Sequence, residues 1–143
     1  MVTLDELIES LPENRQVPFM KLRNLMVENL GKNVIEKINT NAIDYHLPLS
    51  IFPNGDPSNS DLPLHIVSIA SQKRYIGLYS CNFENSGFFN KLKADYVSIR
   101  KTKSCVGKGC IRFDKVENIP YNIISNFVKE MSLKQLLTIM KTK

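Results

Sequence analysis

The stretch LHIVSIASQKRYIGLYS, at residues 64–80, constrains the fold more than any other part of the chain. It contains two apolar, β-branched-rich runs, 64–70 and 75–80, on either side of Ser-Gln-Lys-Arg, a pattern typical of two strands joined by a tight turn. In the second run, Ile76 and Leu78 alternate with residues of the other face, namely Tyr75, Gly77 and Tyr79. We therefore predict a β-hairpin with one apolar face and one face on which two tyrosines flank a glycine.

Helical patterns lie on both sides of this hairpin. Near the N-terminus a capping box of Thr3 and Glu6 precedes the first apolar stripe. The N-terminal stripes are Leu4, Leu7, Ile8 and Leu11, followed by Phe19, Leu22, Met26 and Leu30 with Gly31 as the expected C-cap. Toward the C-terminus the patterns predict helices over 83–94, 119–128 and 132–140 and a strand over 109–113.

Two segments give weaker signals. Residues 34–38 fit either a short helix or a strand, and residues 47–63, with four prolines, fit at most a short edge strand followed by a surface loop. The order of helices, then strands, then helices is typical of an α+β domain. We predict a single domain over residues 1–143, with an antiparallel sheet of four to five strands packed by N-terminal and C-terminal helices.

The composition is that of an ordinary globular domain of 143 residues, with 43% hydrophobic and 23% charged residues. The N-terminus lacks the basic start and apolar run of a signal peptide, and no apolar stretch approaches the roughly 18 residues that span a bilayer. We therefore expect a cytoplasmic protein without a membrane partner. In that compartment Cys81, Cys105 and Cys110 are expected to be free thiols.

The net charge of +5 is unevenly distributed along the chain. Residues 91–115 carry eight basic and two acidic side chains, whereas the remaining residues carry a net charge of −1. A basic segment of this kind can neutralise phosphates, and tyrosines beside it can stack on bases. A nucleic-acid-binding accessory protein that uses the basic 91–115 segment is therefore one predicted function.

Several short motifs resemble those of a known family. They are ASQKRYIGLY (70–79), GKGCIRF (107–113) and IPYNIISNFVKEMSLKQLL (119–137), preceded by a pattern formed by Tyr45, Pro48, Ser50, Pro53 and Gly55. Because these motifs occur in the same order and at similar spacing, the chain resembles the YdhG-like domain family over roughly residues 3–140. The resemblance implies a compact α+β domain with helices covering an antiparallel sheet. Some members are described as frataxin-like iron chaperones, which makes iron a weak candidate ligand.

The sequence departs from this family where metal ligands would matter. The chain has Arg74 and Tyr75 where relatives often place Asn-His, and it lacks the His-Cys pair that some relatives carry after Gly55. Weak iron candidates remain in Asp5, Glu9 and Glu13, spaced at i, i+4 and i+8, although helix dipoles also favour acids in a first turn. A Gly107-Lys108 turn would place Cys105 opposite Cys110, as a metal or redox pair or as two inert thiols.

Catalytic motifs are absent from the sequence. The Gly-Lys-Gly at 107–109 precedes a strand and lacks a following Ser or Thr, unlike a phosphate-binding P-loop, and no Gly-x-Ser-x-Gly elbow occurs. The sequence therefore favours a non-enzymatic binding protein.

The alternation of the strands suggests a binding site instead. Tyr75, Gly77 and Tyr79 share a face of one strand, and Cys110 and Arg112 share a face of another. If the two strands are neighbours, these residues converge on either an anion-binding pocket or an aromatic surface covered by a helix. The predicted ligand is a small anion or an acidic peptide. The candidate ligand-binding residues are Tyr45, Lys73, Tyr75, Tyr79, Lys108 and Arg112.

Overall fold

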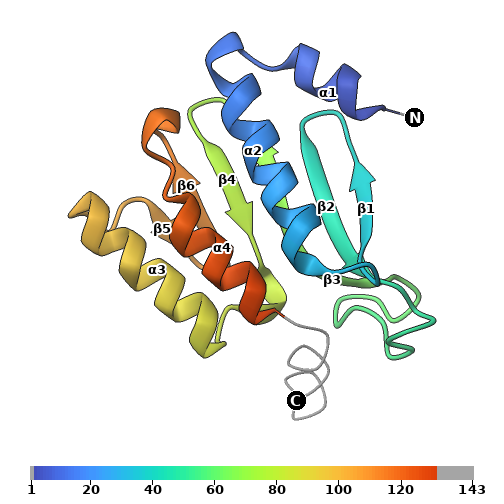
Figure 1. Cartoon of the computed structure of the whole chain (residues 1–143). Coiled ribbons are helices and arrows are strands. Elements are labelled where there is room, and N and C mark those ends of the chain that lie inside the picture. The colour runs from blue at the N-terminus through green and yellow to red at the C-terminus, as the bar shows by residue number, and fades with distance from the viewer. Residues whose placement is uncertain (1, 132–143) are drawn as a thin grey trace.

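The structure, a computed structural model, describes residues 2–131 (Figure 1). Its helices are α1 (Leu4–Ser10), α2 (Glu13–Leu30), α3 (Gly87–Arg100) and α4 (Tyr121–Glu130), with short 3-10 turns η1 (Cys81–Phe83) and η2 (Val116–Asn118). Its strands are β1 (Ile35–Ile38), β2 (Ala42–Leu47), β3 (Leu64–Ser71), β4 (Ile76–Tyr79), β5 (Val106–Gly107) and β6 (Cys110–Phe113). The α+β prediction is confirmed. The helix predicted over 132–140 lies outside the described residues.

The strands form one antiparallel sheet in the order β1-β2-β3-β4-β6-β5. It has six strands rather than the predicted four to five, because residues 35–38 form an edge strand and the two-residue β5 adds the other edge. The predicted hairpin of β3 and β4 is confirmed, with Ile69 opposite Leu78. The prediction of a short edge strand at residue 47 was wrong, because β2 begins at Ala42 and pairs on both sides.

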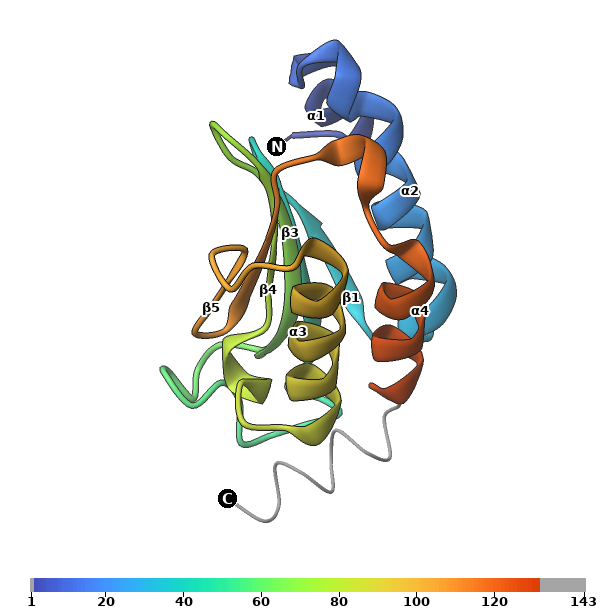
Figure 2. The same ribbon diagram turned by 90° about the vertical axis from the view of Figure 1, so that its left-hand side faces the viewer.

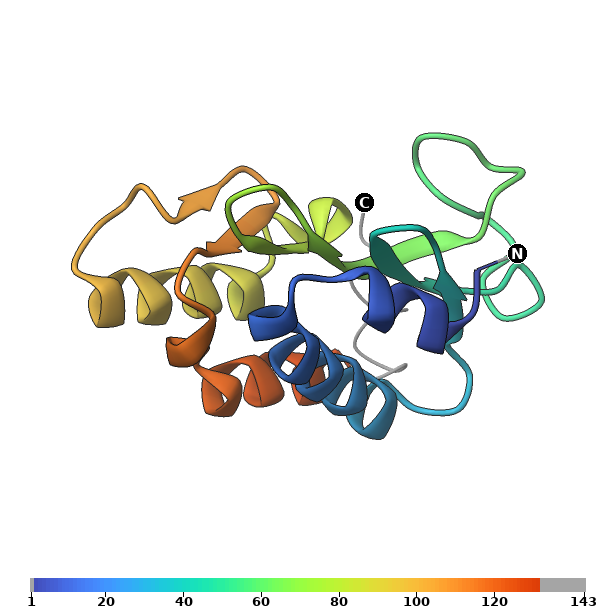
Figure 3. The same cartoon turned by 90° about the horizontal axis from the view of Figure 1, so that it is seen from above.

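The main helices α2, α3 and α4 pack on the same face of the sheet (Figures 2 and 3). The core lies between these layers and includes Phe19, Leu22 and Met26 of α2, Phe89 of α3, Phe127 of α4, and Ile43, Ile69, Leu78 and Ile111 of the sheet. We call the other side of the sheet the open face, because no helix within residues 2–131 covers it. The prediction that N-terminal and C-terminal helices pack the sheet is confirmed, and α2, α3 and α4 all lie on one face.

Local capping explains where the helices begin and end. The predicted capping box is present, since Thr3 Oγ1 accepts from the Glu6 amide and Glu6 accepts from the Thr3 amide. The helix predicted over 83–94 instead spans Gly87–Arg100, because the Ser86 side chain caps it by accepting from the Phe89 amide. This shift places the first part of the basic segment, up to Arg100, in α3.

Candidate functional site

The open face carries a row of polar residues across four strands. Asp44 on β2 pairs with Ser68 on β3, Ser68 pairs with Tyr79 on β4, and Tyr79 pairs with Cys110 on β6. Because paired residues of neighbouring strands point to the same side of a sheet, the four side chains form one line. Arg112, opposite Gly77, lies in the next row toward the β3–β4 turn. The condition that the two strands are neighbours is thus met by β4 and β6.

Arg112 is held by an aromatic ring and a carbonyl group. Its guanidinium carbon lies 6.0 Å from the ring centroid of Tyr75, within the range of a cation–π contact. Its Nη1 donates to the Ser104 carbonyl at 3.2 Å. No carboxylate within residues 2–131 forms an ion pair with it, and nearby Asp114 pairs with Arg100 at 3.1 Å instead. Within residues 2–131, the bond to Ser104 is therefore the one hydrogen bond that this half-buried guanidinium makes.

Tyr79 lies beside this arginine. Its hydroxyl accepts from Gln72 Nε2 at 3.3 Å. Burial, followed by a hydrogen bond with Tyr75, raises the pKa of Tyr79 to about 12, so its phenol stays neutral at physiological pH. Arg112, Tyr75 and Tyr79 thus form one contiguous group, which we call the arginine–tyrosine cluster.

The structure does not bring all predicted site residues together. Lys73 and Lys108 are exposed, in the β3–β4 and β5–β6 turns respectively. Tyr45 lies on the helix-covered face, where it is 2% exposed and donates to Glu36 Oε2 at 2.9 Å. It lines a separate cavity of about 480 Å³ between the end of α2 and β1. Tyr45 is therefore not part of the arginine–tyrosine cluster.

A second polar group on the open face was not predicted from the sequence. His65 Nε2 lies 2.6 Å from Ser68 Oγ, which donates to Asp44 Oδ1 at 2.5 Å. The His46 ring packs edge-on to His65 with centroids 5.5 Å apart. We call Asp44, His46, His65 and Ser68 the histidine cluster.

A β-bulge creates the histidine cluster. His46 pairs with His65 and Tyr45 with Val67, so Ile66 has no partner on β2. In a regular strand, residues three apart point to opposite faces. The extra residue places His65 and Ser68 on the same face, and only this irregularity allows their side chains to meet.

The proton arrangement in this cluster does not activate the serine. Ser68 has one hydroxyl proton, which it donates to the Asp44 carboxylate, so His65 must supply the proton on Nε2. In a Ser-His-Asp triad the histidine lies between the other two and accepts the serine proton. Here the serine lies between aspartate and histidine, which orients the His65 ring rather than creating a nucleophile.

A cavity of about 400 Å³ opens beside the histidine cluster. It is lined by Ile35, Lys37, Asp44, His46, Asp56, Ser58, Leu62, Pro63 and His65. The loop 48–63 forms one wall of this cavity, and β1 with β2 forms the other.

The pKa values of the two histidines determine how the stability of the protein should depend on pH. Burial lowers the pKa of both His46 and His65 below the ordinary 6.5, and His46 lowers that of His65 further, while Asp44 and Asp56 oppose these shifts. Below pH 6.5 the unfolded chain therefore binds more protons than the folded one. We expect urea-unfolding free energies to fall from about pH 6.5 toward about pH 5, less so in His65→Gln. An unfolding free energy that rises as the pH falls from about 6.5 to about 5 would contradict the lowered pKa values of the two histidines.

The cysteines do not form the pair that a Gly107-Lys108 turn would produce. The β5–β6 turn lies at Lys108-Gly109, one residue later than proposed, and places Gly107 opposite Cys110. The Arg112 amide donates to the Cys105 carbonyl, and Cys105 joins the core while Cys110 lies on the open face. Cys81, Cys105 and Cys110 are all free.

The three acidic candidates for an iron site, Asp5, Glu9 and Glu13, do not lie along one helix. Asp5 and Glu9 lie on α1, which ends at Ser10, and Glu13 begins α2, so the helical spacing is interrupted between them. Among the described residues, no group of three or more His, Cys, Asp or Glu is arranged to hold a metal ion.

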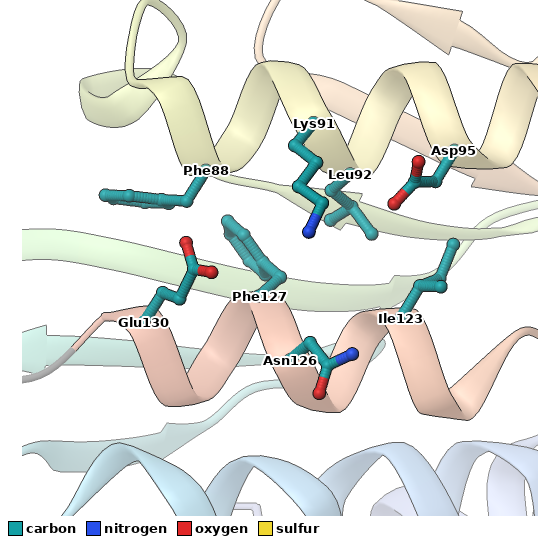
Figure 4. Close-up of a pocket in the computed structure, with 8 residues that line it drawn as sticks. All are labelled: Phe88, Lys91, Leu92, Asp95, Ile123, Asn126, Phe127 and Glu130. Carbon is teal, nitrogen blue, oxygen red and sulfur yellow. The ribbon is translucent and has the colours of Figure 1, made fainter.

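The basic segment is divided between two parts of the structure. Lys91, Lys93 and Arg100 lie on α3, and two of these three form ion pairs, Lys93 with Glu84 and Arg100 with Asp114. Lys91 lines a small groove between α3 and α4, together with Asp95 and Glu130 (Figure 4). That groove has a volume of about 20 Å³, little more than one water needs. Lys101 ends α3, Lys103, Lys108 and Arg112 accompany β5 and β6, and Lys115 precedes η2.

Comparisons with protein-family models, curated proteins and solved structures found no match to this chain. The resemblance to the YdhG-like family therefore stays a prediction. Within residues 2–131, every helix is too short or too polar to cross a membrane.

Proposed function

We propose that this chain is a cytoplasmic, non-enzymatic binding protein that takes a small anion on the open face, with Arg112 as the main contact. The observation that carries the proposal is the state of Arg112. It lies on a sheet face that no described helix covers, it stacks on Tyr75, and it has no carboxylate partner within residues 2–131.

The chemistry of the arginine supports an anionic ligand. A guanidinium presents its donors in a planar fork that matches the two oxygens of a carboxylate or phosphate. The contact with Tyr75 and the bond to the Ser104 carbonyl fix the plane of this fork before a ligand arrives. Less side-chain entropy is then lost on binding. A carboxylate of an acidic peptide would use the same donors.

Two other readings have less support. An iron-binding role would need ligands that converge, and the described residues contain no such group. A nucleic-acid role remains the alternative proposal, because two tyrosines accompany Arg112 on the open face. However, Lys93 and Arg100 already form ion pairs with carboxylates, so fewer positive charges of the basic segment are available to bind phosphates.

Thermal melting tests the proposal. Wild type is melted with and without inorganic phosphate, citrate, nucleoside monophosphates and an acidic peptide, and at least one should raise its melting temperature. Arg112→Ala should unfold within a few degrees of the wild type, as expected for a cost of about 1 kcal/mol or less, yet lose that rise. Lys115 is an exposed residue of the same basic segment. Lys115→Ala removes the same charge as Arg112→Ala but should keep the rise in melting temperature.

Two outcomes would contradict the proposal. The first is that no anion shifts the wild-type protein while Arg112→Ala unfolds far below it, which would make Arg112 structural. The second is salt-dependent retention on single-stranded DNA that depends equally on Lys115 and Arg112, which would favour the nucleic-acid alternative.

A further inference from the structure

Tyr79 adopts an unusual position over Gly77. A Cβ atom placed on Gly77 would lie 2.5 Å from Tyr79 Oη and 2.6 Å from both Cε2 and Cζ. The two residues are alternate positions of β4 and share the open face, so the ring must lie along the strand, with its phenol end directly above the Gly77 backbone. A side chain at residue 77 would occupy this space. The ring therefore lies flat against the sheet instead of standing away from it.

The flat ring is fixed in place before any ligand binds. Gln72 Nε2 donates to its hydroxyl, which lies over the Gly77 backbone. One side of the ring faces the sheet. The other faces away from it, because Tyr79 is only partly buried and no helix within residues 2–131 covers the open face. The protein thus presents a preorganised aromatic surface, which lowers the entropy lost on stacking.

Arg112 lies next to this surface. It is the cross-strand partner of Gly77, over which the phenol end of Tyr79 lies. The Arg112 side chain extends from this position toward Gly107 of β5, so a molecule that contacts both the guanidinium and the outer side of the ring must span β6. The neighbouring Gly107 leaves room for Arg112, whose Nη2 would lie 2.9 Å from a Cβ added there.

We propose that the ligand of the arginine–tyrosine cluster is a planar aromatic ring that carries a phosphate or carboxylate. The ring stacks on Tyr79, and the anionic group is bound by Arg112. This inference rests on the proposed anion-binding function and adds the ring to it. Free nucleotides and single-stranded nucleic acid both offer this chemistry, since each joins a stacking base to a phosphate.

Ribose 5-phosphate and adenosine 5′-monophosphate test the inference, because they carry the same phosphate and differ by the aromatic ring. Adenosine, a third probe, carries the ring without the phosphate. By titration calorimetry, wild type should bind the monophosphate roughly tenfold or more tightly than the sugar phosphate. Tyr79→Leu should abolish this difference, whereas Tyr79→Phe, which keeps the ring, should retain it. Arg112→Ala should weaken both phosphates.

Gly77→Ala provides a second variant that leaves Tyr79 and Arg112 unchanged. The new methyl group should displace the ring, so the preference for the monophosphate should fall while the sugar phosphate still binds. A melting curve shows that each variant is folded. An eight-residue oligonucleotide distinguishes the two sources of the ligand, because nucleic acid should bind it more tightly than the mononucleotide.

The outcomes separate the two proposals. If both phosphates bind equally and Tyr79→Leu changes neither, the inference about the ring is wrong and the anion-binding function stands. If neither phosphate binds, and carboxylates with and without a ring also fail, both proposals are wrong.

Discussion

Replacing Asp56 with alanine should lower the free energy of unfolding by about 2 kcal/mol. The side chain is 9% exposed and accepts four hydrogen bonds, from the Ser58 amide at 3.1 Å, Ser58 Oγ at 2.5 Å, the His65 amide at 2.9 Å and Asn82 Nδ2 at 2.7 Å. It joins the loop 48–63 to β3 and η1. Removing it leaves the partly buried His65 amide without its partner, which is costly.

The pKa of Asp56 indicates how much this carboxylate stabilises the fold and over which pH range the stabilisation is lost. Burial alone would raise it, but the hydrogen bonds from Ser58, His65 and Asn82 together lower it from 3.8 to about 2. This stabilisation is fully present above pH 3.8 and is lost as the pH falls through about 2. Urea unfolding at neutral pH measures the effect. Asp61→Ala, an exposed carboxylate of the same loop, is the control, and equal midpoints for the two variants would contradict the prediction.

Gly55→Ala should be the most damaging glycine substitution in the chain's described part. Gly55 has a φ of +69°, and an added Cβ would lie 2.3 Å from the Ser60 carbonyl oxygen and 2.8 Å from that of Leu62. The backbone conformation costs a non-glycine residue about 1–2 kcal/mol, and the clash with backbone atoms forces the loop to move as well. We expect a loss of roughly 2 kcal/mol or more in denaturant unfolding.

Gly87→Ala is the matched control for this substitution. Gly87 begins α3, and a Cβ added there would meet no atom within 4 Å. Because alanine favours a helix more than glycine does, this variant should be neutral or slightly stabilised. A Gly55→Ala protein as stable as Gly87→Ala would show that loop 48–63 is not tightly packed.

The arginine–tyrosine cluster was predictable because its strands are regular. Alternation along β4 and β6 determines which residues share a face, and pairing of these strands then places Arg112 opposite Gly77. The sequence could not show whether a helix covers this face, since that depends on which side of the sheet α3 and α4 pack. Tyr45 was assigned to the site from a motif, although alternation along β2 places it on the side opposite Asp44.

The histidine cluster could not be predicted by the same rule. Residues 65 and 68 are an odd number apart, and a regular strand would place them on opposite faces. The bulge at Ile66 reverses this, and a local run of apolar residues gives no sign of it. A similar limit applies to the Cys105 and Cys110 pair, where a one-residue shift of the turn toward Gly109 changes every cross-strand partner.

The most direct test of the binding face is an amide chemical-shift map. A ¹⁵N–¹H spectrum of the labelled protein is recorded while an anion that raises its melting temperature is added. If the open face binds the ligand, the largest shifts should occur at Gly77, Tyr79, Cys110 and Arg112, and they should vanish in Arg112→Ala. Shifts concentrated instead around Arg23, Lys32 and Tyr45, in the cavity between α2 and β1, would contradict the assignment of the binding site to the open face.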